Sequence, residues 1–490
     1  MVVGCGSDNN KKESPHETQT IEETTIIKEV ATQEEQNRTE LPTVTAPVPL
    51  PTVTPTTPVV IEKNQKTVTI YIHGYDEKGY KKEHDYGLQY YDTFKNNLIK
   101  YTELPTIDNY HEEEFSNLIT AVDYYGDTPP SYYGEQDTED IEQIDKRYGG
   151  GIPKYAHIVA KFAKNVLKET NASKINIISA SMGSLVTRWL IEKDVEGLVS
   201  QKRIAKWMSV EGVVHGNYAL SQVDDNSFLN IFIENSADTD QMKYQWIEDN
   251  LNPTPRVLNP ILYKDIELSQ ISLTNGKDKG SLLKYVLPLY DGFLPNDGVQ
   301  LFRDTYFDAN LTHTVLHDSH LNINNNSATF LTINNFLKAK KRIQITLLNA
   351  RLRDIHEEIT DTNQEAEVIF ESRVFSPKNR ERWDKDIAID ERLYKSGILS
   401  IYHYKEQNSL YALNQILFDG FVDNSESKLT ILLEGFEIDN STIYSIKERD
   451  SNSSIDSIGA IQTTIELKNG VYEISSDEWS GYIKVEVIEI

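Results

Sequence analysis

The sequence predicts an α/β domain followed by an all-β domain, and three observations lead to this prediction. From about residue 62 to 340, short β-branched runs alternate with apolar helical patterns, as expected of a mostly parallel sheet flanked by helices. Around Ser181, a strand, a corner of small residues and a helix follow one another without a gap. From about residue 341 to 490, short alternating runs separated by polar turns indicate an appended β-sandwich.

The α/β pattern can be divided into individual elements. A helix is expected at Tyr155–Thr170, where apolar residues recur with helical spacing, and a second helix runs from the Ser181 corner to Glu192. The expected strands are Val68–Ile72, Leu118–Tyr124, Ile175–Ser179, Lys206–Val210 and Ile266–Thr274. Just before the first of these helices, Gly149-Gly150-Gly151 lacks the Lys-Ser/Thr that completes a phosphate-binding loop, so a flexible loop is predicted there.

The predicted sandwich consists of short strands, listed as Arg342–Leu348, Ala366–Glu371, Gly397–Tyr402, Lys428–Leu433 and Tyr482–Val487. The stretch Leu467–Glu473 contains Asn-Gly between apolar residues and predicts a two-residue β-hairpin. Three acidic residues, Asp419, Asp423 and Asp439, lie near strand ends without the spacing of calcium ligands, so a solvated acidic rim is expected.

The composition limits the partners of this chain. A formal net charge of −27 argues against nucleic acid and against anionic membrane surfaces as electrostatic partners. With one cysteine in 490 residues, disulfide bonds have no part in the fold. No apolar run approaches the ~20 residues needed to span a bilayer. Neutral ester or lipid substrates are compatible with these properties.

Residues 1–61 are expected to form a tether. The segment is polar and acidic to Glu40, then rich in Thr and Pro from Leu41 to Pro58, and such a composition cannot bury a core. Val2-Val3-Gly4-Cys5 resembles the end of a bacterial lipoprotein signal, although the charged and long apolar regions of a signal peptide are missing. The resemblance implies a lipid anchor at Cys5 and an extracytoplasmic, membrane-anchored protein in the periplasm or at the cell surface.

Ser181 is the candidate nucleophile. Ser179 stands two residues before it and Gly183 two residues after it, at a tight turn from strand to helix. Small residues are needed on both sides because the nucleophile adopts a strained backbone conformation while strand and helix pass closely. The usual pattern has glycine at both flanks, so Ser179 is a departure from it.

Three further segments accompany Ser181 in a fixed order. A strand followed by His73-Gly74 comes first, and Asn296-Asp297-Gly298 and then His320 come after the nucleophile. The chain resembles the α/β-hydrolases from about Lys66 to Leu337, and bacterial lipases and esterases most closely. Met208–Gly216 looks like the strand and His-Gly turn that follow the nucleophile in lipases.

The resemblance implies a role for each of these residues. Ser181 would be the nucleophile, His320 the general base, and Asp297 the acid that orients the imidazole. Backbone N–H groups of Tyr75 and Met182 would form the oxyanion hole. His73 and Gly74 would support the oxyanion loop, and His215-Gly216 would shape a turn near the site. No metal or cofactor is required.

Alternatives remain at two of these positions. His317 lies three residues before His320 and is a second candidate for the base. Asp291 and Asp304 compete with Asp297, whose position in an Asn-Asp-Gly turn before an apolar residue favours it. His313 is expected to be a surface or capping residue. In lipases, the segment that corresponds to residues 216–262 often forms a lid; here a lid and a peripheral pair of helices are both possible.

The sequence thus indicates a serine hydrolase that acts on carboxylic esters through an acyl-enzyme, with lipids as the favoured substrate class. A thioesterase, amidase or peptidase on the same fold is an alternative, because specificity depends on the site and not on the fold. A non-catalytic surface-binding lipoprotein is the other alternative, and it would be expected to have a broken triad.

Overall fold

The computed structural model describes residues 66–75, 93–109, 116–125, 128–222, 236–251, 259–274, 296–307, 311–316, 318–353, 366–375, 394–395, 402–405, 408–438 and 455–489. The predicted tether at residues 1–61 and the anchor residue Cys5 lie outside these ranges. Among the helices of the described ranges, none is long and apolar enough to cross a membrane.

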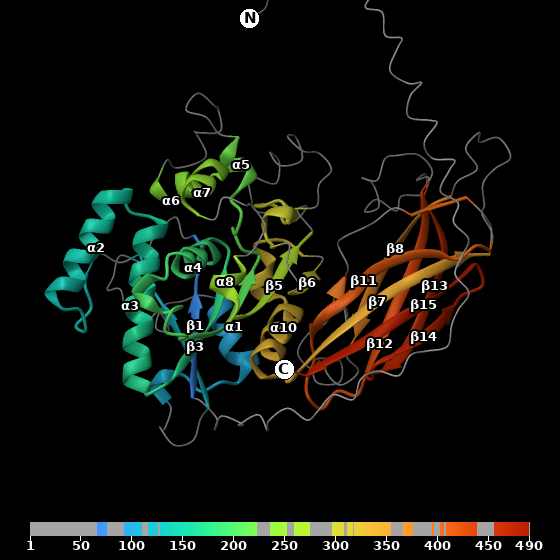
Figure 1. Ribbon diagram of the computed structural model, residues 1–490, viewed down its shortest axis with the longest axis horizontal. Helices are drawn as coiled ribbons and strands as arrows, with labels where there is room; N and C mark the ends of the chain where they lie inside the picture. The colour runs from blue at the N-terminus through green and yellow to red at the C-terminus, as the bar shows by residue number, and fades with distance from the viewer. Residues whose placement is uncertain are drawn as a thin grey trace, which may run out of the picture. The chain divides into compact units, whose positions relative to one another are not determined.

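A six-stranded parallel sheet forms the centre of the first domain (Figure 1). Its strands are β1 (Thr67–Ile72), β2 (Asn117–Val122), β3 (Lys174–Ala180), β4 (Ile204–Val210), β5 (Glu267–Leu273) and β6 (Thr312–Leu316), in the order β2-β1-β3-β4-β5-β6. The five predicted strands are all present with ends shifted by one or two residues, whereas β6 was not predicted. Because every strand is parallel to its neighbours, all six carboxyl ends meet at one edge, where ligands bind in such sheets.

Helices cover both faces of this sheet. α1 (Thr93–Thr102) and α10 (Ser327–Lys338) pack on one face, and α3 (Ile152–Thr170) and α4 (Met182–Glu192) pack on the other. Alternate residues of β1 enter the two cores, because successive side chains of a strand point to opposite faces. α2 (Glu135–Tyr148), which was not predicted, lies outside α3 and is held there by the buried Lys161, whose Nζ is 2.6 Å from Asp137 Oδ1.

The three consecutive glycines form the turn between α2 and α3. Gly149, Gly150 and Gly151 all have positive φ angles, of 73°, 88° and 69°, which residues with a Cβ rarely adopt. The side chain of Gln241 fills the turn: its Oε1 accepts a bond from the backbone N–H of Ile152 at 2.6 Å. The turn is therefore a helix connection and not a phosphate-binding loop.

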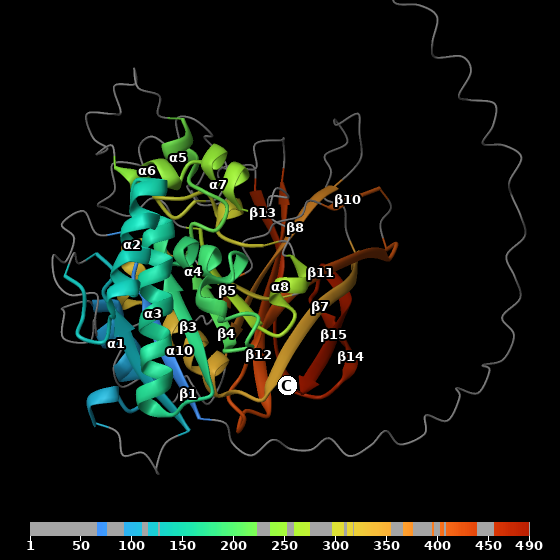
Figure 2. The same ribbon diagram turned by 60° about the vertical axis from the view of Figure 1, so that its left-hand side comes forward.

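Short helices complete the first domain. They are η2 (Ile107–Asn109), η3 (Val195–Gly197), α5 (Tyr218–Ser221), α6 (Ala237–Gln241), α7 (Tyr244–Asn250), α8 (Pro260–Tyr263), η5 (Phe302–Asp304) and η6 (Asn322–Asn325). α5, α6 and α7 belong to the predicted insertion and lie together in Figures 1 and 2. Trp246 of α7 stacks on Trp189 of α4 with ring centroids 5.4 Å apart, so this part of the insertion packs on the core. Residues 223–235 and 252–258 of the insertion lie outside the described residues.

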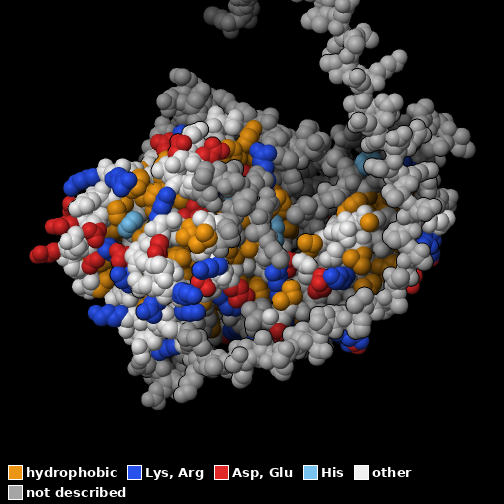
Figure 3. Space-filling model, in the orientation of Figure 1, with side chains coloured by type: hydrophobic (Ala, Val, Ile, Leu, Met, Phe, Trp, Pro, Cys, Tyr) orange, Lys and Arg blue, Asp and Glu red, His pale blue; other side chains and the backbone are white. Residues whose placement is uncertain are grey.

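The second domain is a sandwich of two antiparallel sheets (Figure 2). One sheet contains β8 (Ala366–Phe375), β10 (Tyr402–Tyr404), β12 (Lys428–Ile438) and β13 (Ile455–Glu466) in the order β10-β8-β12-β13, with β9 (Tyr394–Lys395) also on β8. The other contains β7 (Lys341–Leu352), β11 (Tyr411–Phe421), β14 (Gly470–Ser475) and β15 (Trp479–Glu489) in the order β11-β7-β15-β14. Inward-facing side chains of the two sheets meet between them, as where the Trp479 and Phe370 rings lie 4.8 Å apart. Figure 3 shows hydrophobic side chains over part of this domain, and basic and acidic side chains intermingled over the first.

The predicted hairpin at Leu467–Glu473 is wrong. β13 ends at Glu466 and β14 begins at Gly470, but β13 pairs with β12 whereas β14 pairs with β15 in the other sheet. Asn469 Oδ1 accepts a bond from the backbone N–H of Val487 at 2.6 Å, which fixes the chain as it crosses between the sheets. The Asn-Gly signal correctly marked a turn, but the partner of each strand is set by the core of the sandwich.

The expected acidic rim is wrong for Asp419. This side chain is buried, and its two oxygens pair with Arg342 at 2.7 and 2.6 Å on the neighbouring strand β7. Asp423 accepts a bond from the backbone N–H of Ser425 at 2.9 Å and so shapes its own turn. Asp439 lies outside the part of the chain that the structure describes.

Candidate active site

Ser181 occupies the sharp turn between β3 and α4. Its φ of 50° and ψ of −125° are strained for a residue with a side chain. The turn is held from both sides, because the Ser181 N–H donates to Val210 O at 3.0 Å and the Val213 N–H donates to Ser181 O at 3.1 Å. A Cβ at Gly183 would lie 2.3 Å from His73 O, so glycine is required where α4 passes β1. The geometry is that of a nucleophile elbow.

Ser179 departs from the usual glycine, and its hydroxyl has a structural use. Ser179 Oγ accepts a bond from Trp207 Nε1 at 2.8 Å and lies 3.0 Å from Ser184 Oγ. Ser209 Oγ donates to the same Ser184 hydroxyl at 3.0 Å. These side chains are buried beneath the elbow, where an indole N–H without an acceptor would be costly. Ser179 thus satisfies the indole of Trp207.

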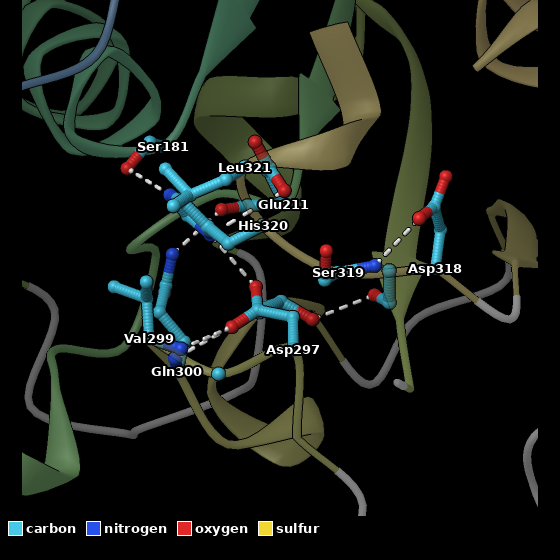
Figure 4. Close-up of polar contacts among 12 residues, drawn as sticks. Ser181, Glu211, Asp297, Val299, Gln300, Asp318, Ser319, His320 and Leu321 are labelled. Carbon is cyan, nitrogen blue, oxygen red and sulfur yellow. Dashed lines mark hydrogen bonds and ion pairs between the residues drawn. The ribbon is translucent and has the colours of Figure 1, made fainter. Parts of the chain in front are cut away.

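Ser181, His320 and Asp297 lie in one continuous chain of hydrogen bonds (Figure 4). Ser181 Oγ is 3.0 Å from His320 Nε2, and His320 Nδ1 is 2.8 Å from Asp297 Oδ2. The His320 backbone N–H also donates to Asp297 O at 2.8 Å, which fixes the two loops relative to each other. The structure therefore brings the three predicted residues together in the predicted order, although 139 residues separate the serine from the histidine.

The turn that begins at Asn296 prepares the Asp297 carboxylate. Gly298 has a φ of 96°, and the backbone N–H groups of Val299 and Gln300 donate to Asp297 Oδ1 at 2.8 and 2.7 Å. Oδ2 is left to accept from His320, as Figure 4 shows. Asp297 thus both shapes its own turn and faces His320 Nδ1.

Among the other candidate acids and bases, Asp304 is described by the structure and is not part of this chain of bonds. Asp304 is buried and receives a hydrogen bond from the hydroxyl of Tyr244. Asp291 and His317 lie outside the described residues. His215 Nε2 is 2.9 Å from Tyr306 O, which agrees with a role in shaping the chain near the site.

The expectation that His313 is a surface or capping residue is wrong. It lies within β6, with its ring against Phe302 and Tyr306 and its Nε2 2.8 Å from Ser272 Oγ. Burial lowers the pKa of His313 to about 4, so the ring is neutral at physiological pH. The expectation failed because strand β6, which contains His313, was not predicted.

The predicted oxyanion loop approaches the nucleophile. A Cβ at Gly74 would lie 2.9 Å from Ser181 Cβ, so the main chain before Tyr75 runs directly beside the elbow. Met182 is the first residue of α4, where backbone N–H groups have no partner within the helix. His73 stacks on Tyr124 at 4.0 Å, and the Tyr124 hydroxyl donates to His73 O at 2.7 Å and is 3.1 Å from Gly74 O. Tyr124 is a support for this loop that the sequence interpretation did not identify.

Glu211 is a second residue that the sequence interpretation missed. It is 3% exposed, and its Oε2 lies 3.3 Å from His320 Nδ1 (Figure 4). Burial raises the pKa of the Glu211 carboxyl well above 4.5, and the nearby charges of Asp297 and Asp318 raise it further. A carboxyl group therefore stands beside the imidazole in addition to the predicted acid.

Glu211, Asp297 and His320 also form the group that could hold a metal ion among the described residues, with one ligand atom from each within 4.8 Å of the others. An ion between these three groups would bind His320 Nδ1, the nitrogen that in the structure faces Asp297 Oδ2. Metal binding and the hydrogen-bonded chain from Ser181 to Asp297 are thus mutually exclusive uses of this atom.

Comparisons with known proteins gave similarities of structure. No family model and no curated protein matches the sequence. The mature Bacillus licheniformis lipase BlEst2 covers 57% of this chain and 94% of its own, at 12% identity and a TM-score of 0.36. The metagenomic carboxyl esterase MGS0156 covers 57% of this chain and 71% of its own, at 14% identity and a TM-score of 0.32. Phospholipase PlaB from Legionella pneumophila covers 80% of this chain and 91% of its own, at 9% identity and a TM-score of 0.35.

The strand order and the elbow define the class of fold. A parallel sheet with a nucleophile elbow after β3, followed in the sequence by an acid and then a histidine at the same sheet edge, is the α/β-hydrolase fold. The antiparallel sheets after α10 add a β-sandwich to it.

Proposed function

We propose that this chain is a serine hydrolase that cleaves carboxylic esters, with Ser181 as nucleophile, His320 as base and Asp297 as orienting acid. The observation that carries the proposal is the unbroken series of contacts from Ser181 Oγ through His320 to Asp297 Oδ2, at 3.0 and 2.8 Å. A serine hydroxyl is a weak nucleophile until a neighbouring base removes its proton, and this series provides that base. Lipids and other esters with an acyl chain are the proposed substrates.

The proposed reaction has two halves. Ser181 Oγ attacks the ester carbonyl carbon while its proton passes to His320 Nε2, and the carbonyl oxygen becomes an oxyanion. The alcohol then leaves with the proton from His320, and the acyl group remains on Ser181. Water then attacks the acyl carbonyl carbon as it gives a proton to His320 Nε2. The bond from that carbon to Ser181 Oγ breaks, His320 returns the proton to Ser181 Oγ, and the carboxylic acid is released. Asp297 stabilises the imidazolium in each half.

The oxyanion would be bound by the backbone N–H groups of Tyr75 and Met182. Two features support this assignment: Gly74 lies against Ser181, and Met182 is the first residue of α4. Removal of one such donor from an active site typically lowers turnover about 100- to 1,000-fold. The series of contacts at Ser181 and these two N–H groups together need no metal or cofactor.

A fluorophosphonate probe tests the proposal. The wild-type chain is expected to be labelled, Ser181→Ala is expected not to be, and Ser200→Ala serves as control because Ser200 is exposed and outside the site. Absence of labelling in folded wild-type protein would contradict the proposal and favour the non-catalytic alternative. Hydrolysis of p-nitrophenyl esters from acetate to long acyl chains then identifies the acyl preference, and a preference for acetate would count against a lipase.

The alternative chemistries are separated by the leaving group. Matched ester, thioester and anilide substrates with the same acyl group should give the highest kcat/KM for the ester. A higher value for the thioester or the anilide would replace the proposed activity with a thioesterase or an amidase, while leaving the nucleophile assignment intact.

We also propose that the protein is held at a bacterial membrane by lipid on Cys5, facing away from the cytoplasm. Cys5 and the tether lie outside the described residues, so the support comes from the resemblance of Val2–Cys5 to a lipoprotein signal. Metabolic labelling with an alkyne fatty acid in the native host should mark the wild-type protein and not Cys5→Ser. Equal labelling of the two proteins would contradict the proposal of a lipid anchor at Cys5.

A further inference from the structure

Glu211 stands at the end of the strand next to that of the nucleophile. β4 pairs with β3 in parallel, with Val210 opposite Ala180, so Glu211 and Ser181 each follow the paired ends of neighbouring strands. The Glu211 N–H donates to Ile271 O at 2.7 Å, and Glu211 O accepts from Gln300 Nε2 at 2.7 Å. The main chain of Glu211 is therefore fixed between β5 and the loop that carries Asp297.

The backbone of Glu211 is in a conformation that is unfavourable for a glutamate. Its φ is 44°, in the left-handed region. The following residue must be glycine, because a Cβ at Gly212 would lie 2.1 Å from Ser209 Oγ and 2.5 Å from Ser184 Cβ. Strained conformations of this kind cluster at functional sites. The turn directs the side chain of Glu211 inward to His320.

Two buried carboxyl groups share one nitrogen. His320 Nδ1 lies 2.8 Å from Asp297 Oδ2 and 3.3 Å from Glu211 Oε2, and the two acids are 1% and 3% exposed. Two carboxyl groups this close in a buried site cannot both be ionised without a large cost in free energy. The Nδ1–H can donate to one carboxylate at a time, and Asp297 is the nearer.

The surroundings decide which acid carries the charge. Asp297 accepts two backbone N–H bonds, from Val299 and Gln300, whereas no hydrogen bond reaches Glu211 Oε2 within the described ranges. Hydrogen bonds from N–H groups favour the ionised form of a carboxyl group. Burial first, and the charges of Asp297 and Asp318 after it, raise the pKa of Glu211, so that Glu211 is the protonated member of the pair.

We propose that Glu211 is a positioning residue that shares the Nδ1 side of His320 with Asp297 and can hold the imidazole alone when Asp297 is removed. Loss of the Asp297 charge removes one cause of the raised pKa of Glu211, while burial, the largest cause, and the charge of Asp318 remain. Glu211 Oε2, 3.3 Å from His320 Nδ1, is then the carboxyl oxygen beside that nitrogen, and the imidazolium stabilises the ionised form of Glu211, which accepts the Nδ1–H. This inference rests on the proposed function only for its kinetic readout.

A double-mutant cycle tests this role. Glu211→Gln alone should lower kcat/KM about threefold or less, and the same change in an Asp297→Ala background should lower it at least about 30-fold, a coupling of about tenfold or more. Asp304→Asn, which alters another buried acid that does not contact His320, should have the same effect in both backgrounds. Equal factors for Glu211→Gln in the two backgrounds would show a merely structural residue and overturn the proposal.

The pH profile provides a readout that a structural role would not change. A carboxylate beside His320 favours the imidazolium, so the acid limb of kcat/KM in Asp297→Ala should move to lower pH when Glu211→Gln is added. An unchanged limb would contradict the proposal. If Asp297→Ala does not fold, Asp297→Asn keeps an oxygen for the two backbone donors and replaces it in the cycle.

An NMR titration separates this inference from the proposed function. The pKa of His320 should be lower in Asp297→Ala/Glu211→Gln than in Asp297→Ala, whether or not the protein turns over any ester. If the chain has no hydrolase activity but this difference is observed, the proposed function fails and the positioning role stands. An unchanged His320 pKa would overturn the role even in an active enzyme.

Discussion

The turns that follow β3 and β4 share a positive φ angle and a nearby glycine, and they hold different side chains. Ser181 and Glu211 both have positive φ angles, of 50° and 44°, and each is followed closely by a glycine whose Cβ would clash, at positions 183 and 212. Ser181 is partly exposed, whereas Glu211 is buried. Two turns with these shared features thus hold a partly exposed hydroxyl at one strand end and a buried carboxyl beside His320 at the next.

The difference in exposure between Ser181 and Glu211 fits the different roles that we propose for them at one edge of the sheet. In the proposed mechanism the nucleophile must reach the substrate, and Ser181 is the more exposed of the two residues. An acid that acts on a histidine is more effective without water, because electrostatic interactions are stronger in a buried site. Neighbouring strand ends meet both requirements within a few ångströms of His320.

Substitution of the two glycines is expected to give the largest effect and to separate the turns. Gly183→Ala would push against the backbone carbonyl of His73 and displace the oxyanion loop, so kcat/KM should fall about 100-fold, the cost of a displacement of about 1 Å. Gly212→Ala meets the side chains of Ser209 and Ser184 and should mainly lower Tm. Measurements of kcat/KM and Tm for both variants test this prediction. An equal loss of kcat/KM in the two variants would contradict the different roles of the two turns.

Tyr124→Phe should have the next largest effect, on the Ser181 side of the comparison. The hydroxyl that donates to His73 O would be lost, and the oxyanion loop would lose a fixed point without any change at the elbow. We expect kcat to fall about tenfold with a small change in KM, as for a contact that matters most in the transition state. A change in KM alone would assign Tyr124 to substrate binding.

Glu211→Gln should change how stability depends on pH, on the other side of the comparison. Because the folded-state pKa of Glu211 is raised, the native protein keeps a proton that the unfolded chain loses, so stability falls as pH rises above about 4.5. Glutamine does not titrate, so the variant keeps this stability as pH rises. At pH 7–8 the Tm of the variant should exceed that of the wild type by roughly 2–4 °C for each kcal/mol of stability that the wild type loses, whereas at pH 4 it should not. Parallel Tm curves for both proteins across this range would contradict the raised pKa.

Ser179→Gly should have the smallest effect on activity. It restores the usual glycine but leaves the Trp207 indole without its acceptor, which should lower the free energy of unfolding by about 1–3 kcal/mol. The kcat/KM should remain within about threefold of the wild-type value, because the hydrogen bonds of the Ser179 hydroxyl go to Trp207 and Ser184 and not to His320. Denaturant unfolding and kcat/KM together check this, and a large loss of kcat would make Ser179 part of the elbow's function.

Much of this arrangement follows from local sequence. The elbow, the Asn-Asp-Gly turn at Asp297 and His320 lie in short segments whose order along the chain indicates a shared sheet edge, and their hydrogen bonds agree with that order. Five of the six strands of the parallel sheet were predictable for a similar reason, since burial on both faces leaves continuous apolar runs.

The residues that were missed depend on neighbours distant in the sequence. Glu211 looks like a polar residue at the end of a strand, and only the loops carrying Asp297 and His320 make it a buried acid. A usable signal was the adjacent Gly212, which marks a close approach of the chain. His313 was misjudged because β6 was not predicted, and the false hairpin arose because Asn-Gly specifies a turn but not the strands that pair beyond it.

The position of β15 has a consequence for when the sandwich can form. β15 lies between β7 and β14 in its sheet, yet β7 is made at the beginning of the domain and β15 after every other strand described. During synthesis, β7 therefore emerges long before β15, and the backbone N–H and C=O groups along the edge of β7 that pairs with β15 have no strand partner until then. Contacts so distant in sequence form slowly. The α/β domain, whose strands and helices alternate along the chain, can assemble first. The sandwich is completed last, when β15 pairs between β7 and β14.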